Sequence, residues 1–432
     1  MRIKGIIVFS LLLGALLTDS AWAGQRVPLD DQLRILEQGR QPARLIPGAK
    51  HRVAVFTFED ADGTGLADVA AALVAREILT NSKVSSIGVI FFEGGLAPSA
   101  DSGLSYFDKV ERVTAAQEVT LAAWGIIRET AKGVQIDTYL QIPAPSLDKY
   151  FSWTLKLPQT MGARELSARL RPDRVLLLRR VFSADGLEQL RSAATAIGRV
   201  RADPRADAEI TADLPLSEVY YLTERQAGWV RLETHSGVNG WAPAAGHCQG
   251  ECKPFLEAAT FTGQVLRYMA DGSLPTSRQR LSLESQAIAD QLEILARLNS
   301  KSIDELYEAA NQAHSWQRPE TVPPGGAAFA NLEALAVLGL GLKEAFVEVA
   351  ERDFGVDVRG GEPVPDSVEQ QIYDSIKLSP ENVKRIASPL AKASQYDPRN
   401  SDVLGNLSVL FGYVGDADRA DLAQRLAVKY AR

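Results

Sequence analysis

Five short runs of strand-forming residues between residues 197 and 244 constrain the fold of this chain more than any other feature. Each run alternates between apolar and polar residues or is rich in β-branched and aromatic residues, as strands are. Turn pairs such as Asp203-Pro204 and Asn239-Gly240 separate the runs. Since a small open sheet leaves its edges unpaired, so much strand in so short a segment predicts a closed or nearly closed barrel. The predicted strands are 198–202, 208–212, 218–222, 228–233 and 239–242.

The same segment resembles a bacterial SH3-like domain, which we place at 195–246. Residues 199–204 stand where that family has its opening "VRSGPS" motif. Gly228-Trp229 begins a run that matches the family's "GWYKV" strand, and Gly240-Trp241 matches its closing "GW". The resemblance implies a module that binds peptides or glycans in the cell envelope and rarely performs catalysis.

Aromatic and polar side chains of this segment are the candidate ligand-binding residues. Because side chains alternate along a strand, Tyr220 and Tyr221 should lie on opposite faces, so that some of the rings face outward. Aromatic platforms with charged residues at the rim suit proline-rich peptides or peptidoglycan stem peptides. The alternative is that Trp229 and Trp241 belong to the barrel core. The candidates are Tyr220, Tyr221, Glu224, Arg225, Trp229, His235, Asn239 and Trp241.

Residues 51–185 show the order β-α-β-α-β-β, which predicts an α/β layer with a mixed sheet. Helical spacing of apolar residues predicts helices at 66–79, with Thr64 as the candidate N-cap, and at 104–118. A turn at 130–133 predicts a hairpin between the two strands that flank it. The predicted strands are 52–58, 84–92, 121–127, 134–142, 150–157 and 174–181.

This order of elements resembles the small periplasmic domains of TolB-type proteins and of CsgG- and FlgO-like envelope proteins. The likeness rests on residues 53–60, which an alanine-rich helix follows, and on residues 120–127. It implies that the domain acts through protein contacts or assembly.

Beyond residue 253 the pattern changes to helices separated by proline, glycine or polar breaks. Gly325-Gly326, which follows two prolines, is the predicted hinge between a helical segment at 253–324 and a domain at 325–432. The predicted helices are 253–268, 279–298, 303–313, 328–353, 366–378, 380–395, 402–413 and 417–431.

The C-terminal end resembles a tetratricopeptide repeat, with 397–400 as the turn between repeats. Stacked repeats usually hold an extended peptide on their concave face, so the resemblance implies a protein partner. A non-repeating helical bundle is the alternative. The positions that fit the packing residues of the repeat are Leu390, Ala393, Leu404, Leu407, Phe411, Gly415, Ala420 and Ala427.

The N-terminus has the pattern of a secretory signal. Arg2 and Lys4 precede an apolar stretch at 5–17, and Ala21-Trp22-Ala23 has the spacing of a cleavage site. We expect a cleaved signal peptide at 1–23, a leader segment at 24–50 and a mature protein in the periplasm. No later segment is expected to span a membrane, because charges interrupt the apolar run at 327–349.

The two cysteines, Cys248 and Cys252, lie close together just after the predicted barrel. Exported chains form disulfides readily, so a Cys248–Cys252 disulfide is expected. Zinc would need further ligands such as His247 and His235, but the spacing matches no standard zinc site. A catalytic redox pair would be spaced C-x-x-C, one residue closer.

The sequence shows no recognisable catalytic set. It lacks a phosphate-binding loop, a nucleophile elbow and an H-E-x-x-H motif, and its four histidines are scattered. Glu59, Asp60 and Asp62 lack the bidentate Glu of a calcium loop, so they are interpreted as an acidic turn that enters a helix. The net charge of -7 argues against a nucleic-acid partner.

The sequence therefore predicts a multidomain α+β protein, with an N-terminal α/β sandwich, a central small SH3-like barrel and a C-terminal all-α helical repeat or bundle. We expect a non-catalytic periplasmic scaffold or adaptor that binds a peptide or peptidoglycan through the barrel and a protein partner through the helices. No cofactor and no metal are expected, and a homo-oligomer stays open. The alternatives are a structural subunit of an envelope assembly and a cell-wall hydrolase with an unrecognised site.

Overall fold

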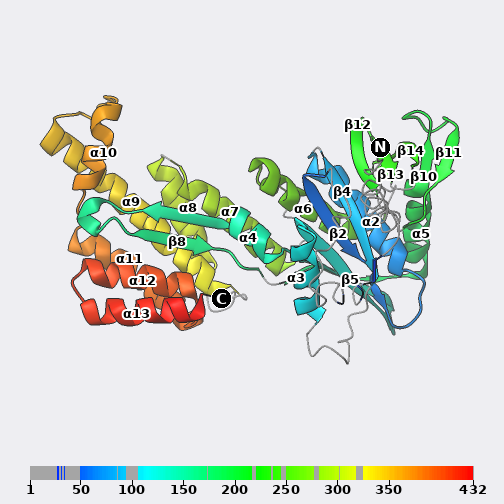
Figure 1. Ribbon diagram of the computed structural model, residues 1–432, viewed down its shortest axis with the longest axis horizontal. Coiled ribbons are helices and arrows are strands. Elements are labelled where there is room, and N and C mark those ends of the chain that lie inside the picture. The colour runs from blue at the N-terminus through cyan, green and yellow to red at the C-terminus, as the bar shows by residue number, and fades with distance from the viewer. Residues whose placement is uncertain are drawn as a thin grey trace, which may run out of the picture. The chain divides into compact units, whose positions relative to one another are not determined.

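The computed structural model describes residues 27–28, 31, 34, 49–84, 86–93, 106–172, 174–216, 220–234, 237–244, 250–276, 282–300, 302–317 and 325–431. The chain is of mixed α and β structure and divides into two compact units (Figure 1). The first unit consists of Met1–Ser146 and Asp173–Ser282, and the second of Leu147–Pro172 and Leu283–Arg432. The predicted signal peptide lies outside the described residues.

One large mixed sheet forms the centre of the first unit, as predicted for its N-terminal part. The central strand β2 is parallel to its neighbours β4 and β5, and the hairpin of β5 and β6 continues antiparallel into β9. Two short strands, β1 and β3, extend the pairing beside β4 and β5. The strands are β1 (Val27–Pro28), β2 (His51–Phe56), β3 (Glu59–Asp60), β4 (Ile87–Glu93), β5 (Leu121–Thr130), β6 (Gly133–Gln141) and β9 (Arg174–Phe182).

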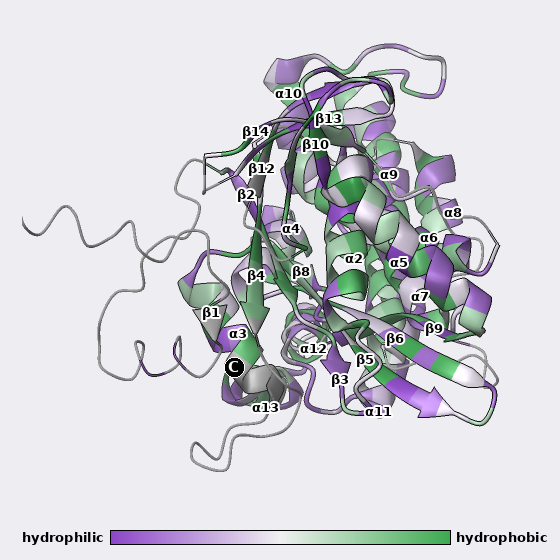
Figure 2. Ribbon diagram, turned by 90° about the vertical axis from the view of Figure 1, so that its right-hand side faces the viewer, coloured by the Kyte–Doolittle hydropathy of each residue, from purple (hydrophilic) through white to green (hydrophobic). Residues whose placement is uncertain are grey.

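Helices cover both faces of this sheet. Ala54 and Phe56 of β2 pack in one apolar cluster with Val110 and Val113 of α3, so the alternate residues of β2 face the other side. The strand β4 is coloured largely hydrophobic, whereas the far ends of β5 and β6 are hydrophilic (Figure 2). The helices in the described part of this unit are α2 (Ala67–Ser82), α3 (Tyr106–Ala116), α5 (Ala184–Gly198) and α6 (Cys252–Asp271).

Helix α2 is buried on nearly all sides, because it lies against the sheet and also packs against α5 and α6. The contact with α6 is so close that a Cβ at Gly263 would lie 2.6 Å from the carbonyl oxygen of Ile78. The expected N-cap of α2 was wrong. Leu66 occupies the N-cap position without a side-chain hydrogen bond. Thr64 instead donates its backbone N–H to Asp60 Oδ1 (2.9 Å) in the acidic turn before the helix.

All five runs predicted for the SH3-like segment are strands, but they continue the large sheet. The order from the outer edge is β11, β10, β14, β13 and β12, and β12 then pairs antiparallel with β4 through Tyr220 and Leu222. Pairing with β4 covers the edge that an isolated small sheet would have to hide by closing into a barrel. The strands are β10 (Arg199–Arg201), β11 (Ile210–Asp213), β12 (Tyr220–Gln226), β13 (Trp229–Thr234) and β14 (Asn239–Pro243).

The second unit combines helices with one two-stranded hairpin that comes from between β6 and β9 in the sequence. In this hairpin, the short helix η1 (Gln159–Met161) joins β7 (Ser152–Lys156) to β8 (Glu165–Arg169). The predicted strand at 150–157 is thus paired outside the large sheet. Helix α4 (Ala144–Tyr150) directly precedes this hairpin in the sequence. Its residues up to Ser146 belong to the first unit and those from Leu147 to the second.

Each of the eight helices predicted after residue 253 is present, and all but α6 belong to the second unit. Side chains cap several N-termini: Ser302 accepts from the N–H of Glu305, Ser379 from that of Asn382, and Asp416 from that of Arg419. The other helices are α7 (Leu283–Leu298), α8 (Ile303–Ser315), α9 (Gly326–Phe354), α10 (Asp366–Ser375), α11 (Pro380–Tyr396), α12 (Ser401–Tyr413) and α13 (Ala417–Tyr430).

Candidate functional site

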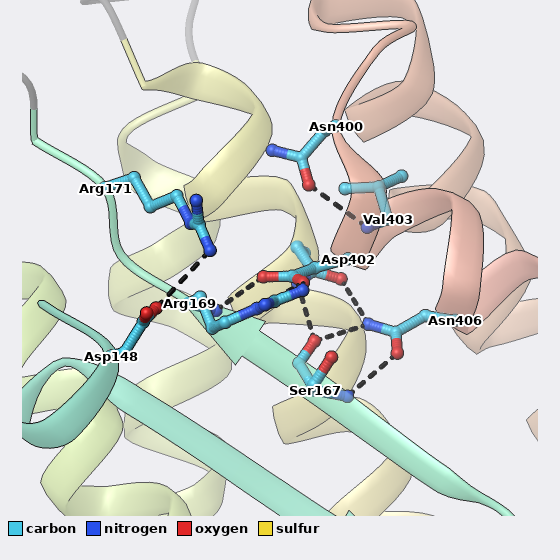
Figure 3. A network of polar contacts seen from close by, with 9 residues as sticks. Asp148, Ser167, Arg169, Arg171, Asn400, Asp402, Val403 and Asn406 are labelled. Atoms are coloured by element: carbon cyan, nitrogen blue, oxygen red, sulfur yellow. Dashed lines mark hydrogen bonds and ion pairs between the residues drawn. The ribbon is translucent and has the colours of Figure 1, made fainter. Parts of the chain in front are cut away.

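Side chains of α12 hydrogen-bond to one edge of strand β8 (Figure 3). The backbone N–H of Ser167 donates to Asn406 Oδ1 at 2.9 Å, and that of Arg169 donates to Asp402 Oδ2 at 2.8 Å. The spacings match, since four residues of helix advance about 6 Å and two residues of strand about 6.6 Å. The helix therefore offers two acceptors in register with two donors of the strand.

The same edge is also bound through one carbonyl group, that of Ser167. Ser167 O accepts from Asn406 Nδ2 at 2.8 Å and from Asn331 Nδ2 of α9 at 3.2 Å. Asn406 Nδ2 further donates to Asn331 Oδ1 at 2.8 Å, so the two helices are linked through their amides. Both asparagines are buried. We call Asn331, Asp402 and Asn406 the strand ladder, because together they bind an extended backbone through polar side chains.

Arg169 binds Asp402 a second time, through its side chain. Arg169 Nε donates to Asp402 Oδ1 at 2.7 Å, and a terminal guanidinium nitrogen donates to the same oxygen. The carboxylate of Asp402 is only 6% exposed, and the hydrogen bond to it is the main reason why the pKa of Arg169 is raised. The buried negative charge is thus neutralised by a guanidinium that the strand itself supplies.

The apolar side of the hairpin fills a groove of the helical unit. Leu157, Met161 and Leu166 line a residual cavity of only about 20 Å³ together with leucines of the helices, among them Leu335 and Leu390. The hairpin thus occupies a face of the helices that would otherwise be open.

A larger cavity of about 450 Å³ lies at the end of β8. Arg169 and Arg171 line it from the hairpin, and Arg399 lines it from the turn before α12. We call it the arginine pocket. Helix α9 begins at this cavity, and its N-cap Gly325 provides no side-chain cap. The residues that line it are Arg169, Arg171, Gly325, Gly326, Ala327, Ala328, Tyr396, Asp397, Arg399, Asn400, Ser401, Asp402 and Tyr430.

The guanidinium groups of the arginine pocket differ in how far the fold uses them. Arg171 lies 3.4 Å from Asp148, and these side chains are 45% and 60% exposed. Such an exposed pair contributes little stability. Arg399 is exposed, and the described residues give its guanidinium no ion pair. Arg171 and Arg399 therefore provide two positive charges for a ligand in the cavity, whereas Arg169 is bound to Asp402.

The predicted residues of the SH3-like segment fall into two groups. Glu224 and Asn239 are exposed and both contact Arg231, at 3.6 Å from Arg231 Nη1 to Glu224 Oε2 and 3.0 Å from Arg231 Nε to Asn239 Oδ1. Trp229 is half-buried on the same face of β13 as Arg231. Glu224, Arg231 and Asn239 therefore form a polar surface row on the side of the sheet that also carries the indole ring of Trp229.

Arg225 and Trp241 serve the fold instead. The guanidinium of Arg225 donates to the carbonyl oxygens of Leu79 (2.6 Å), Thr80 (3.0 Å) and Val84 (3.2 Å), around the C-terminal end of α2. Its pKa is lowered by burial. Trp241 is only 8% exposed, in agreement with the core alternative for this residue.

The other predicted residues are only partly visible. The backbones of Tyr220 and Tyr221 pair with β4, while their side chains, like His235 and Cys248, lie outside the described residues. Cys252 is buried in the first turn of α6. The Cys248–Cys252 disulfide stays a prediction.

The strand ladder was missed at the sequence level. A signal exists in retrospect, because Asp402 and Asn406 lie one turn apart on a helix whose other residues are mainly apolar. Polar residues at buried helix positions need hydrogen-bond partners. What the sequence does not show is that the partner is a strand more than two hundred residues away, at Ser167 and Arg169.

Within the described ranges, no three or more His, Cys, Asp or Glu side chains gather as a metal site would require. None of the described helices combines the length and the apolar composition needed to cross a membrane. Comparison with known protein families, with characterised proteins and with solved structures finds no match.

Proposed function

We propose that this protein is a non-catalytic periplasmic scaffold or adaptor. It binds an envelope ligand, a peptide or peptidoglycan, through its SH3-like strands, and a protein partner through its helical unit. The observation that carries the proposal is that the helical unit holds an extended segment of its own chain, β8, by its backbone through Asn331, Asp402 and Asn406. Backbone recognition of this kind is what peptide-binding modules use for affinity.

We propose that the C-terminal end of the helical unit is a tetratricopeptide-like repeat. Leu404 and Leu407 of α12 and Ala420 and Ala427 of α13 are buried at positions where the repeat packs, and Gly415 takes a positive φ of 81° in the turn between them. These facts support the proposed repeat. Because the hairpin already fills one groove, we place partner binding at the open arginine pocket.

For the envelope ligand we propose the surface row of Glu224, Arg231 and Asn239 beside Trp229. Charged groups around an aromatic ring are typical of binding surfaces. Export through a cleaved signal peptide and a Cys248–Cys252 disulfide belong to the same proposal. Thiol titration of the unreduced, denatured mature chain tests the disulfide, and we expect no reactive thiol.

A structural subunit of an envelope assembly is the second candidate, and the course of the chain favours it. Residues 147–172 fold with the second unit although the sequence on both sides belongs to the first. A segment of this kind is what copies of a protein exchange in domain swapping. Mass photometry decides between the two, since discrete rings or higher oligomers support the assembly and a monomer or dimer supports the adaptor.

The adaptor function is tested by retention of the mature protein on peptidoglycan sacculi and by crosslinking in envelope extracts. Trp229→Ala with Arg231→Ala should weaken retention on sacculi, and Arg171→Glu with Arg399→Glu should remove the crosslinked partner. Arg425→Glu, at an exposed arginine of α13 that pairs with Asp421, is the control. No retention and no crosslink with the unaltered protein would contradict the proposal, and clearing of sacculi in a zymogram would favour the hydrolase.

A further inference from the structure

The arginine pocket contains guanidinium groups that contribute little to the stability of the fold. Arg169 is committed to Asp402 through two side-chain hydrogen bonds. Arg171 has one long contact, to the exposed Asp148, as Figure 3 shows. The backbone N–H of Arg399 donates to Asp397 Oδ1 at 3.0 Å, but its guanidinium has no ion pair to any residue that the structure describes.

The electrostatic balance of the cavity favours an anion. Its lining has three arginines against two carboxylates, and Arg169 already neutralises Asp402. The whole chain, in contrast, has a net charge of -7. Guanidinium groups bind carboxylates through two parallel hydrogen bonds, which gives direction as well as attraction.

The size and the lining of the cavity favour the end of a peptide. A volume of about 450 Å³ lies in the range of ligand sites and suits a few residues. Strand β8, which the strand ladder binds by its backbone, ends at Arg169 on the rim. Tyr396 and Tyr430 line the same space, and their rings would pack against the side chains that precede a chain end.

We propose that the arginine pocket binds the free terminal carboxylate of a peptide, with Arg171 and Arg399 as the two groups that hold it. The carboxylate comes either from the C-terminus of a protein or from the end of a peptidoglycan stem peptide. This inference rests on the proposed adaptor function and names the ligand class of its helical unit.

Fluorescence anisotropy with the intact mature protein tests the ligand class. The probes are tetra-alanine with fluorescein at its N-terminus and a free terminal carboxylate, the same peptide as its terminal amide, and a version that ends in D-alanyl-D-alanine. We expect the carboxylate to bind roughly tenfold or more tightly than the amide, since a charged hydrogen bond is lost in the amide. Tighter binding of the D-alanyl-D-alanine probe indicates the stem peptide, and tighter binding of the L-peptide indicates a protein C-terminus. Equal affinity for carboxylate and amide would overturn the proposal.

Variants locate the site. Arg171→Ala with Arg399→Ala should lower the affinity for the carboxylate probe to that of the amide, while Arg359→Ala with Arg425→Ala, at exposed arginines outside the pocket, should leave it unchanged. Full carboxylate affinity in the pocket variant would overturn the assignment. Retention on sacculi without any binding of the tetrapeptides would reject the pocket proposal and leave the adaptor function standing, so the two are separable.

Discussion

At the scale of single residues, the buried carboxylate of Asp402 makes the second unit depend on one guanidinium. We predict that Arg169→Ala destabilises the protein by about 3 kcal/mol or more, because it leaves Asp402 charged and buried without its partner. Arg171→Ala, two residues further along, removes only an exposed contact at 3.4 Å and should cost under about 1 kcal/mol. Urea unfolding measures both, and equal losses for the two variants would contradict this account.

Glu77 in α2 makes stability depend on pH. Burial raises the pKa of Glu77 from 4.5 to about 7, against the lowering effects of the hydrogen bond from Asn81 and the charge of Arg76. Between these values the folded protein binds the proton more tightly than the unfolded chain does. The free energy of unfolding should therefore fall by roughly 3 kcal/mol as pH rises from 4.5 through 7.

The variant Glu77→Gln tests this prediction, because it removes the titrating group and keeps the shape of the side chain. We expect it to flatten the fall in unfolding free energy between pH 5 and pH 8. Glu188→Gln, at an exposed carboxyl of α5, is the matched control and should leave the pH profile as it is. A profile that stays steep in Glu77→Gln would show that other groups carry the pH dependence.

At the scale of elements, local patterns predicted what depends on local physics. The hairpin of β5 and β6 and the helices from α6 to α13 were predicted because periodicity, turns and caps depend on residues that are close together in the sequence. Pairing of β12 with β4 was not predicted, since Tyr220 and Val89 meet only through the tertiary fold. Sequence reasoning favoured a closed barrel because it treated the edge of β12 as having no partner.

The candidate site shows the same limit. The sequence left open whether Trp241 is a binding residue or a core residue, because a strand pattern shows on which face a side chain lies and not what covers that face. In the structure Trp241 is buried. Arg225 was predicted at a rim, yet it caps a helix that precedes it by well over a hundred residues. Side chains of one type serve binding and capping alike, so only the three-dimensional partners decide between the two.

The strand ladder predicts how the hairpin of β7 and β8 responds to mutation. Asn406→Ala leaves the N–H and carbonyl groups of Ser167 without their main partner, so the amides of β8 should exchange with deuterium markedly faster. The control is Asp416→Ala, which removes the N-cap hydrogen bond to Arg419 in α13 and should cost about 1 kcal/mol. Mass spectrometry of the peptide that contains 163–172 should show faster exchange in the first variant alone. The same exchange rate in both variants would show that the ladder does not hold the strand.

At the scale of the whole molecule, each unit is made from two separate stretches of the chain. The boundaries predicted at 185, 246 and 324 follow changes in composition, which occur along the sequence. The units are defined instead by packing, which places α6 with the sheet and the hairpin of 147–172 with the helices. A composition shift therefore indicates a change of secondary structure, and it does not by itself mark a boundary between compact units.

This division predicts that the helices of the second unit do not fold well alone. A fragment of residues 283–432 lacks the hairpin, so Leu335, Leu338, Leu390 and Leu410, which line the groove against it, become exposed. We expect the fragment to aggregate or to unfold without a cooperative transition, because a contiguous apolar groove of this kind favours association. Addition of a peptide of residues 147–172 should restore a monomeric, cooperatively melting complex, measured by gel filtration and circular dichroism.

The control is the same peptide with Arg169→Ala and Leu166→Ala. It should restore folding poorly, since it loses the partner of Asp402 and an apolar contact. Cooperative folding of the fragment as a monomer, with no peptide present, would show that the hairpin is dispensable and that the helices alone form the unit.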